Sequence, residues 1–123
     1  MNIFESAEDY LERILMLSEK KQFIRAIDIA NDMNFSKASV SIALKKLRDK
    51  QYVIVDDEHG SIHLTEEGKK IALKVYNRHK TLTKFLMYIG VSEDGAKEDA
   101  CKIEHDLSDE TMEKIEEFIK RIK

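Results

Sequence analysis

No proline occurs anywhere in the 123 residues, and glycine occurs only four times. Proline and glycine are the two residues that most disfavour the interior of a helix. A chain that almost lacks both can carry long helices, so we expect a mainly α fold. The clear exception lies between Gln51 and Leu64, where the spacing of apolar residues changes from that of a helix to that of a strand.

Length and composition place the chain among small globular proteins. A chain of 123 residues forms one domain or two small, joined domains. Charged residues make up 37% of it, and no apolar run approaches the length of a membrane span. The first five residues lack the basic start and apolar core of a signal peptide. The single cysteine cannot form an internal disulfide, which suits a reducing compartment, so we expect a cytoplasmic protein without membrane contact.

Charge is distributed unevenly along the chain. The net charge is −3, which argues against indiscriminate binding to nucleic acid. Residues 36–52 contain five basic side chains and one acidic side chain, whereas residues 86–123 contain six basic and eleven acidic side chains. The sequence therefore has one basic segment and an acidic C-terminal end.

Three helices are predicted in the first half, at residues 6–19, 25–33 and 37–50, from apolar residues that recur at helical spacing. Ser6 and Ser36 are positioned to cap the first and third. In the first helix, Asp9 and Glu12 fall on the face opposite the apolar stripe. Solvent exposure is the simple explanation for these two carboxylates, but Met16 on the same face suggests that something covers it.

The second and third predicted helices form a helix-turn-helix pattern, for which an ordinary corner between two helices is the alternative. The outer face of the third helix favours DNA binding, because the side chains near its N-terminal end are small and mostly uncharged. Ile42 is available to a thymine methyl group, and Ser41 to base edges or phosphate. The residues predicted to contact double-stranded DNA are Ser36, Lys37, Ala38, Ser39, Ser41, Ile42, Lys45, Lys46 and Arg48.

A β-hairpin is predicted directly after this unit. Residues 52–55 and 61–64 have strand-like patterns, and residues 56–60 form the turn between them. A hairpin at this place makes the unit a winged helix. The acidic turn would repel phosphate, so we expect the backbone contacts to come mainly from the basic third helix. His59 and His63 are expected to be ordinary wing residues.

Three more helices follow, beginning after Thr65, Ser92 and Ser108. They carry more apolar surface than one small domain needs, which predicts self-association. Cys101, Glu104 and His105 follow the spacing i, i+3, i+4, so on a helix they would share a face and offer sulfur, oxygen and nitrogen donors to a metal. A buried thiol beside a solvated Glu–His pair fits the triplet by itself at least as well. His79 lies in the apolar seam of the long helix, either as a hydrogen-bonded core residue or as a metal ligand.

The order of these elements, from about Ser6 to Ile122, is distinctive. Seven short motifs accompany it: Glu8–Glu12, Ser39–Ser41, Leu64–Lys69, Arg78–His79, Phe85–Leu86, Ile89–Val91 and Ala100–Ser108. On these motifs the chain resembles the diphtheria-toxin-repressor and manganese-transport-regulator family of metal-dependent bacterial repressors. The last motif is the most specific, and its spacing to His79 also fits.

The resemblance implies a winged helix-turn-helix DNA-binding domain at residues 1–70 and a helical metal-binding and dimerisation domain at residues 71–123. The helix from about 66 to 89 links them. It further implies a homodimer that binds a palindromic operator and represses genes of metal-ion homeostasis when Mn²⁺ or Fe²⁺ is bound. Larger members carry an SH3-like domain, and the chain resembles a short form without it. The metal ligands that the resemblance implies are Asp9, Glu12, His79, Cys101, Glu104 and His105.

This ligand set is mixed. Asp9 and Glu12 match manganese-type members, whereas Cys101 matches iron-type members. Carboxylates favour manganese and a thiolate favours softer metals such as ferrous iron, so both metals stay open. The resemblance also implies that the ligands come from both the DNA-binding half and the dimerisation half. A metal bound by both would fix one half relative to the other, and whether one or two ions bind stays open.

Two other classes of function are alternatives. A metal-independent winged-helix regulator would respond to another ligand or partner and would leave the Cys101 motif as ordinary surface. An enzyme would need an open cleft and a general base, and the sequence contains no Gly-rich phosphate loop, nucleophile elbow or His-Glu-x-x-His motif. We therefore expect neither an enzyme nor a small-molecule substrate.

Overall fold

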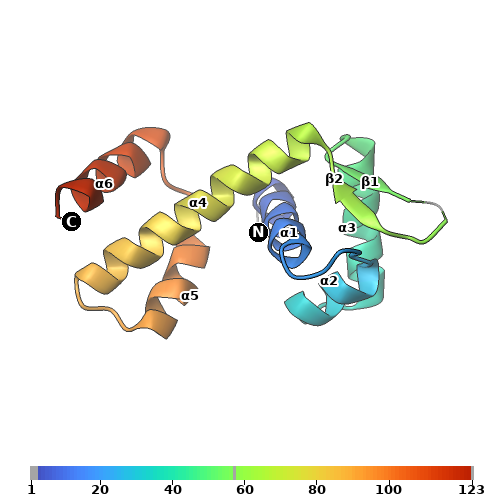
Figure 1. Cartoon of the computed structure of the whole chain (residues 1–123), viewed down its shortest axis with the longest axis horizontal. Coiled ribbons are helices and arrows are strands. Elements are labelled where there is room, and N and C mark those ends of the chain that lie inside the picture. The colour runs from blue at the N-terminus through green and yellow to red at the C-terminus, as the bar shows by residue number, and fades with distance from the viewer. Residues whose placement is uncertain (1–2, 57, 123) are drawn as a thin grey trace. The chain divides into compact units, whose positions relative to one another are not determined.

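The computed structural model describes residues 3–56 and 58–122, which form six helices and one two-stranded sheet (Figure 1). In chain order the elements are α1 (Ile3–Ser18), α2 (Ala26–Met33), α3 (Lys37–Asp49), β1 (Val53–Val55), β2 (Ile62–Leu64), α4 (Glu66–Tyr88), α5 (Glu93–Ile103) and α6 (Asp109–Arg121). They divide into two compact units, the first ending at Leu73 and the second beginning at Lys74. The mainly α fold is confirmed. None of the described helices is both long enough and apolar enough to cross a membrane.

The first unit is built around side chains that the helical period predicts to be buried. Leu11 and Ile14 of α1, Ile29 of α2 and Val40 of α3 are almost completely inaccessible to solvent. Each such side chain stabilises the fold by about 1.5–3 kcal/mol relative to an exposed one. These contacts hold α3 against α1 and α2 by one face, and its opposite face stays available.

Side-chain caps set the start of most later helices. The hydroxyls of Ser36, Ser92 and Ser108 each accept a hydrogen bond from the main-chain N–H three residues later, at the starts of α3, α5 and α6. Thr65 does the same for α4. The expected cap at Ser6 is wrong, because α1 already begins at Ile3 and Ser6 lies within it. Nothing between residues 3 and 6 disfavours a helix, so the extra turn forms.

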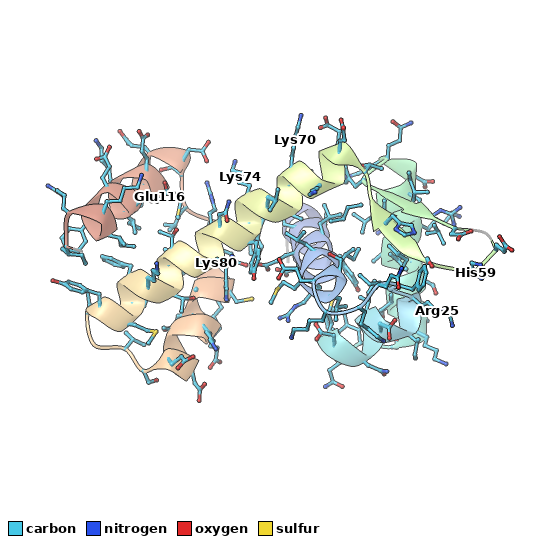
Figure 2. All side chains as sticks on the ribbon, in the orientation of Figure 1. Arg25, His59, Lys70, Lys74, Lys80 and Glu116 are labelled. Atoms are coloured by element: carbon cyan, nitrogen blue, oxygen red, sulfur yellow. The ribbon has the colours of Figure 1, made fainter. Side chains whose placement is uncertain are left out.

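The predicted hairpin is confirmed, with strands one residue shorter than expected. Val53 pairs with Leu64, Ile54 with His63 and Val55 with Ile62 in an antiparallel register. Val53 and Ile62 are buried while Ile54 is exposed, as alternation along a strand requires. Figure 2 shows His59 at the tip of this hairpin, where its side chain is exposed.

The chain that leaves α3 passes very close to the first turn of α4. Gly68 lies against the main chain of Tyr52, and a β-carbon built on Gly68 would be only 2.0 Å from the Tyr52 carbonyl oxygen. The same carbonyl accepts a hydrogen bond of 3.0 Å from the Thr65 N–H. There is no room for a β-carbon at this position, so glycine is required there. Its small size lets the hairpin pack against the start of α4.

The second unit is a small three-helix arrangement in which α5 and α6 lie on either side of the later part of α4 (Figure 1). Leu82, Ala100 and Met112, one from each helix, form its buried centre. The rings of Phe85 and Phe118 add an edge-to-face contact with centroids 6.0 Å apart. This core fixes the end of α5 against α4.

The close approach at Gly68 predicts that Gly68→Ala destabilises the protein. The added methyl group must displace the main chain at Tyr52, and overpacking of this kind costs about 1–3 kcal/mol. We expect the free energy of unfolding, measured by urea denaturation and circular dichroism, to fall by that amount. Lys69→Ala, at the exposed neighbouring position, is the control and should change it by less than about 0.5 kcal/mol. Equal effects of the two substitutions would contradict the steric argument.

Candidate metal site and nucleic-acid interface

The outer face of α3, with its capping residue, forms an exposed surface. All nine residues predicted to contact DNA are exposed, whereas Val40, Leu44 and Leu47 on the inner face are buried. Ile42 stands out, because a large apolar side chain there remains 60% exposed. A surface of small, hydroxylated and apolar side chains at the start of a helix has the chemistry that reads base edges in a major groove.

A groove of about 570 Å³ runs beside α3, where the helix faces the hairpin. Lys45 and Arg48 contribute positive charge to its wall, and Asp49 contributes a carboxylate. Val55 of β1 also lines it, which the sequence pattern did not identify as part of a binding surface. Alternation along β1 predicts only whether a side chain is buried or exposed. Val55 borders this groove because of the way α3 packs on β1.

In α1, the two acidic residues of the predicted metal site lie one turn apart. Asp9 is half-buried, and Glu12 is only 4% exposed. The simple expectation of a solvent-exposed face is therefore wrong for Glu12, and the neighbouring Met16 is half-buried too. Burying a carboxylate is costly unless it is paired with another group or coordinates a metal. The only sequence signal for this burial was indirect, the apolar Met16 on the same face.

In the second unit, three of the predicted ligands meet. Glu104 is 1% exposed, and its carboxylate oxygen Oε2 lies 3.0 Å from Nδ1 of His79. Nε2 of His105 is 3.5 Å from the other oxygen, Oε1. Among the described residues, Oε1 has no hydrogen-bond partner. The structure thus brings together His79, Glu104 and His105, with the carboxylate between two imidazoles.

The local structure at these residues differs from the expectation. The spacing of Cys101, Glu104 and His105 predicts one shared helix face, but α5 ends at Ile103. Cys101 lies half-buried in its last turn, Glu104 is the C-terminal cap, and His105 belongs to the following turn. The Glu104 N–H still donates to the Ala100 carbonyl, so Glu104 keeps helical geometry, whereas His105 is positioned by the turn.

The turn is closed by an arginine that the sequence analysis did not single out as functional. One terminal nitrogen of Arg78, Nη1, donates to the main-chain carbonyls of Glu104 and Leu107 at 2.9 and 2.8 Å. The other, Nη2, donates to Asp109 Oδ1 at 2.6 Å. The position of Arg78 immediately before His79 in a recognised motif was the only sequence signal for it.

This donor set fits a divalent transition metal. Imidazole nitrogens and a carboxylate oxygen are ligands that manganese, iron and zinc accept, and the half-buried Cys101 lies one turn before Glu104. The Glu104 carboxylate is fully buried, and one of its oxygens has no hydrogen-bond partner in the part of the chain that the structure describes, so a cation placed there would stabilise it. The donor set is therefore chemically suited to a cation.

Comparison with known proteins covers both units. Residues 2–61 match the N-terminal DNA binding domain of the iron dependent repressor family, and residues 65–123 match its metal binding and dimerisation domain. An uncharacterised HTH-type transcriptional regulator of Methanocaldococcus jannaschii is 40% identical over 121 residues, which cover 97% of this chain and 96% of that protein. The HTH-type transcriptional regulator MntR of Bacillus pumilus is 39% identical over 114 residues, which cover 93% of this chain and 78% of that protein.

A solved structure also resembles the chain. The manganese regulator SloR matches with a TM-score of 0.83 at 33% sequence identity, covering 93% of this chain and 53% of the SloR chain. The chain thus spans about half the length of that solved protein.

The charges around Asp109 predict a pH dependence of stability. A hydrogen bond and the charge of Lys74, followed by those of Arg78, hold the pKa of Asp109 below its usual value of 3.8. A lowered folded-state pKa means that Asp109 stabilises the fold at pH values above about 4 and loses this effect as the pH falls through the folded-state pKa. We expect the difference in melting temperature between the native protein and Asp109→Asn to be constant from pH 7 to pH 5 and to shrink below pH 4. A difference that grows on acidification would contradict this assignment.

Proposed function

The chain belongs to the iron dependent repressor family, and from this premise we propose that it is a metal-activated repressor that binds operator DNA as a homodimer. The observation that carries the proposal is the buried Glu104 carboxylate between the imidazoles of His79 and His105. A metal-activated DNA-binding repressor needs such a site to sense the cation, and it needs no catalytic group. We propose no enzymatic activity.

The proposed ligands are the three residues that meet in the second unit, together with Cys101 from the last turn of α5. The family resemblance adds Asp9 and Glu12 from α1. A bound divalent ion would supply the positive charge that balances these carboxylates. Carboxylate and imidazole ligands favour Mn²⁺, and the Cys101 thiolate favours Fe²⁺, so we propose activation by one of these two metals. The name of SloR as a manganese regulator supports the first choice by similarity.

Metal binding would act on DNA binding by linkage. Asp9 and Glu12 belong to the unit that contains α3, and the other four proposed ligands belong to the unit with α5 and α6. If all six hold the same ion, the arrangement that satisfies them is favoured by the free energy of metal binding. In a homodimer, that arrangement must place two α3 helices in successive major grooves of a palindromic operator, about 34 Å apart.

Within each α3, we propose a division between base and phosphate contacts. Ile42 would contact a thymine methyl group and Ser41 a base edge, while Lys37, Lys45, Lys46 and Arg48 would contact phosphates. Ser36, Ala38 and Ser39 would border the DNA backbone at the start of the helix. The exposure of these nine residues supports the proposal. The regulated genes would be those of metal-ion homeostasis. The protein would act in the cytoplasm, the compartment that contains the DNA.

A mobility-shift assay tests the proposed function directly. The DNA is the region upstream of the chain's own gene, and the conditions are Mn²⁺, Fe²⁺ under anaerobic conditions, and chelator. We expect a retarded complex with at least one metal and none with chelator. Equal retardation in all three conditions would instead support a metal-independent winged-helix regulator.

His79→Ala should abolish metal-dependent operator binding without unfolding the protein. The substitution removes one imidazole from Glu104, and loss of a ligand lowers the population of the DNA-competent state. Metal titration and the mobility shift measure the effect, and circular dichroism verifies the fold. His63→Ala on the exposed face of β2 is the matched control and should bind metal normally. If His79→Ala still bound operator tightly only in the presence of metal, the ligand assignment would be wrong.

Neutralising Lys45 and Lys46 together should weaken the salt dependence of operator binding. Each phosphate contact contributes about 0.9 to the slope of log K against log salt concentration. Lys45→Gln/Lys46→Gln should therefore reduce the slope by about 1.8 for each subunit on the operator, or about 3.6 for the homodimer. The control is Lys114→Gln/Lys120→Gln, which removes the same charge from α6 and should leave the slope unchanged. An unchanged slope in the α3 double variant would show that these lysines do not contact phosphate.

A further inference from the structure

Arg78 is an unusually enclosed cation in the second unit. Its side chain is only 11% exposed, and its guanidinium donates hydrogen bonds to three oxygens on a different part of the chain. Two of these oxygens are main-chain carbonyls, those of Glu104 and Leu107. A lysine has a single nitrogen on a flexible stem, so it cannot reproduce this forked set of bonds.

The three acceptors bracket one short segment, the turn between α5 and α6. Glu104 caps the C-terminus of α5, where the last carbonyls lack N–H partners from the helix itself. Asp109 is the first residue of α6. A cation at the end of a helix is favoured by the helix dipole as well as by these bonds. Arg78 therefore satisfies the end of α5 and ties the start of α6 to α4 at the same time.

Two of the proposed metal ligands, Glu104 and His105, lie on the segment that Arg78 holds. Glu104 is contacted from α4 at both of its ends: Arg78 bonds its main-chain carbonyl, and the adjacent His79 bonds its carboxylate. His105 follows Glu104 directly, within the same turn. A side chain whose main chain is fixed has fewer positions available, which reduces the ordering cost when it binds a ligand.

We propose that Arg78 is a positioning residue of the metal site, which holds the main chain of residues 104–107 so that Glu104 and His105 are in place before the metal binds. This rests on the proposed metal-sensing function. Arg78 itself does not contact the metal. It acts as the outer partner of a ligand, a role whose loss lowers metal affinity about 10- to 100-fold in other proteins.

The test compares Arg78→Lys with a matched control on the same helix. Lys74 lies one turn earlier on α4 and also pairs with Asp109 Oδ1, at 3.3 Å. Its side chain is well exposed, and among the described contacts no hydrogen bond joins it to the carbonyl of Glu104 or Leu107. Lys74 is labelled in Figure 2. Lys74→Gln therefore removes a cation from the same carboxylate without disturbing the turn. Asp109→Asn removes the negative charge of the third acceptor and leaves both carbonyl bonds possible.

Two measurements separate positioning from folding. The dissociation constant for Mn²⁺ is measured by calorimetry, and the visible absorption spectrum of the Co²⁺ form reports the ligand geometry. We expect Arg78→Lys to raise the dissociation constant at least tenfold and to change the Co²⁺ spectrum. For Lys74→Gln and Asp109→Asn, the dissociation constant should stay within about threefold of the native value. Both variants should keep the native Co²⁺ spectrum. Urea denaturation of each metal-free variant gives its folded fraction.

Each result has a defined meaning. A folded Arg78→Lys protein with native affinity and spectrum would overturn the proposal. So would a loss of affinity that the unfolded fraction fully explains. If the native protein bound neither Mn²⁺ nor Fe²⁺ nor Co²⁺, the proposed function itself would fail, which is a different outcome.

A measurement on the native protein applies even if Arg78→Lys does not fold. Hydrogen exchange followed by mass spectrometry reports the order of residues 104–108 with and without Mn²⁺. Because Arg78 already holds this turn, we expect the exchange protection of the Glu104 and Asp106 amides, both of which are hydrogen-bonded, to be present without metal. Protection that appears only when metal is added would overturn the proposal.

Discussion

The second unit depends on how a fully buried carboxylate, that of Glu104, is kept in place. Removing such a group from water costs several kcal/mol unless nearby groups compensate. His79 supplies one hydrogen-bonding nitrogen, and Arg78 fixes the main chain from which the carboxylate extends. Both come from adjacent positions of α4, whose Leu82 also packs against α5 and α6. The hydrophobic core and the polar site of this unit therefore share one helix, and a change that shifts α4 disturbs both.

The first unit meets a different demand, because α3 must be anchored firmly and still expose a surface. Val40, Leu44 and Leu47 anchor one face of α3 in the core, so the residues of the opposite face contribute little to packing. Ile42 shows the consequence: it is exposed although its burial would stabilise the fold. A residue that is not optimal for folding is expected where a surface has been shaped for binding.

Much of this arrangement could be predicted from the sequence, because it is set by local rules. The lack of proline, the helical period and the hydroxyl caps at Ser36, Ser92 and Ser108 correctly located the helices, and alternation located the hairpin. The end of α5 at Ile103, the burial of Glu12 and the bonds of Arg78 could not be predicted in this way. The carbonyls that Arg78 contacts lie 26 and 29 residues further along the chain, so only tertiary packing brings them together. The donor residues of the second unit were found by motif, but their geometry was not.

The opposite net charges of residues 36–52 and 86–123 have a kinetic consequence for a protein that must find one site among many. The basic residues of α3 are attracted to the phosphates of any duplex, whereas the excess of acidic residues in the segment with α5 and α6 is repelled by them. Collisions that begin with the acidic segment are therefore short-lived, and those that begin with α3 last longer. A diffusing molecule of this kind samples DNA mainly with the exposed surface of α3. The unequal charge thus shortens the search for a target without adding any contact to the final complex.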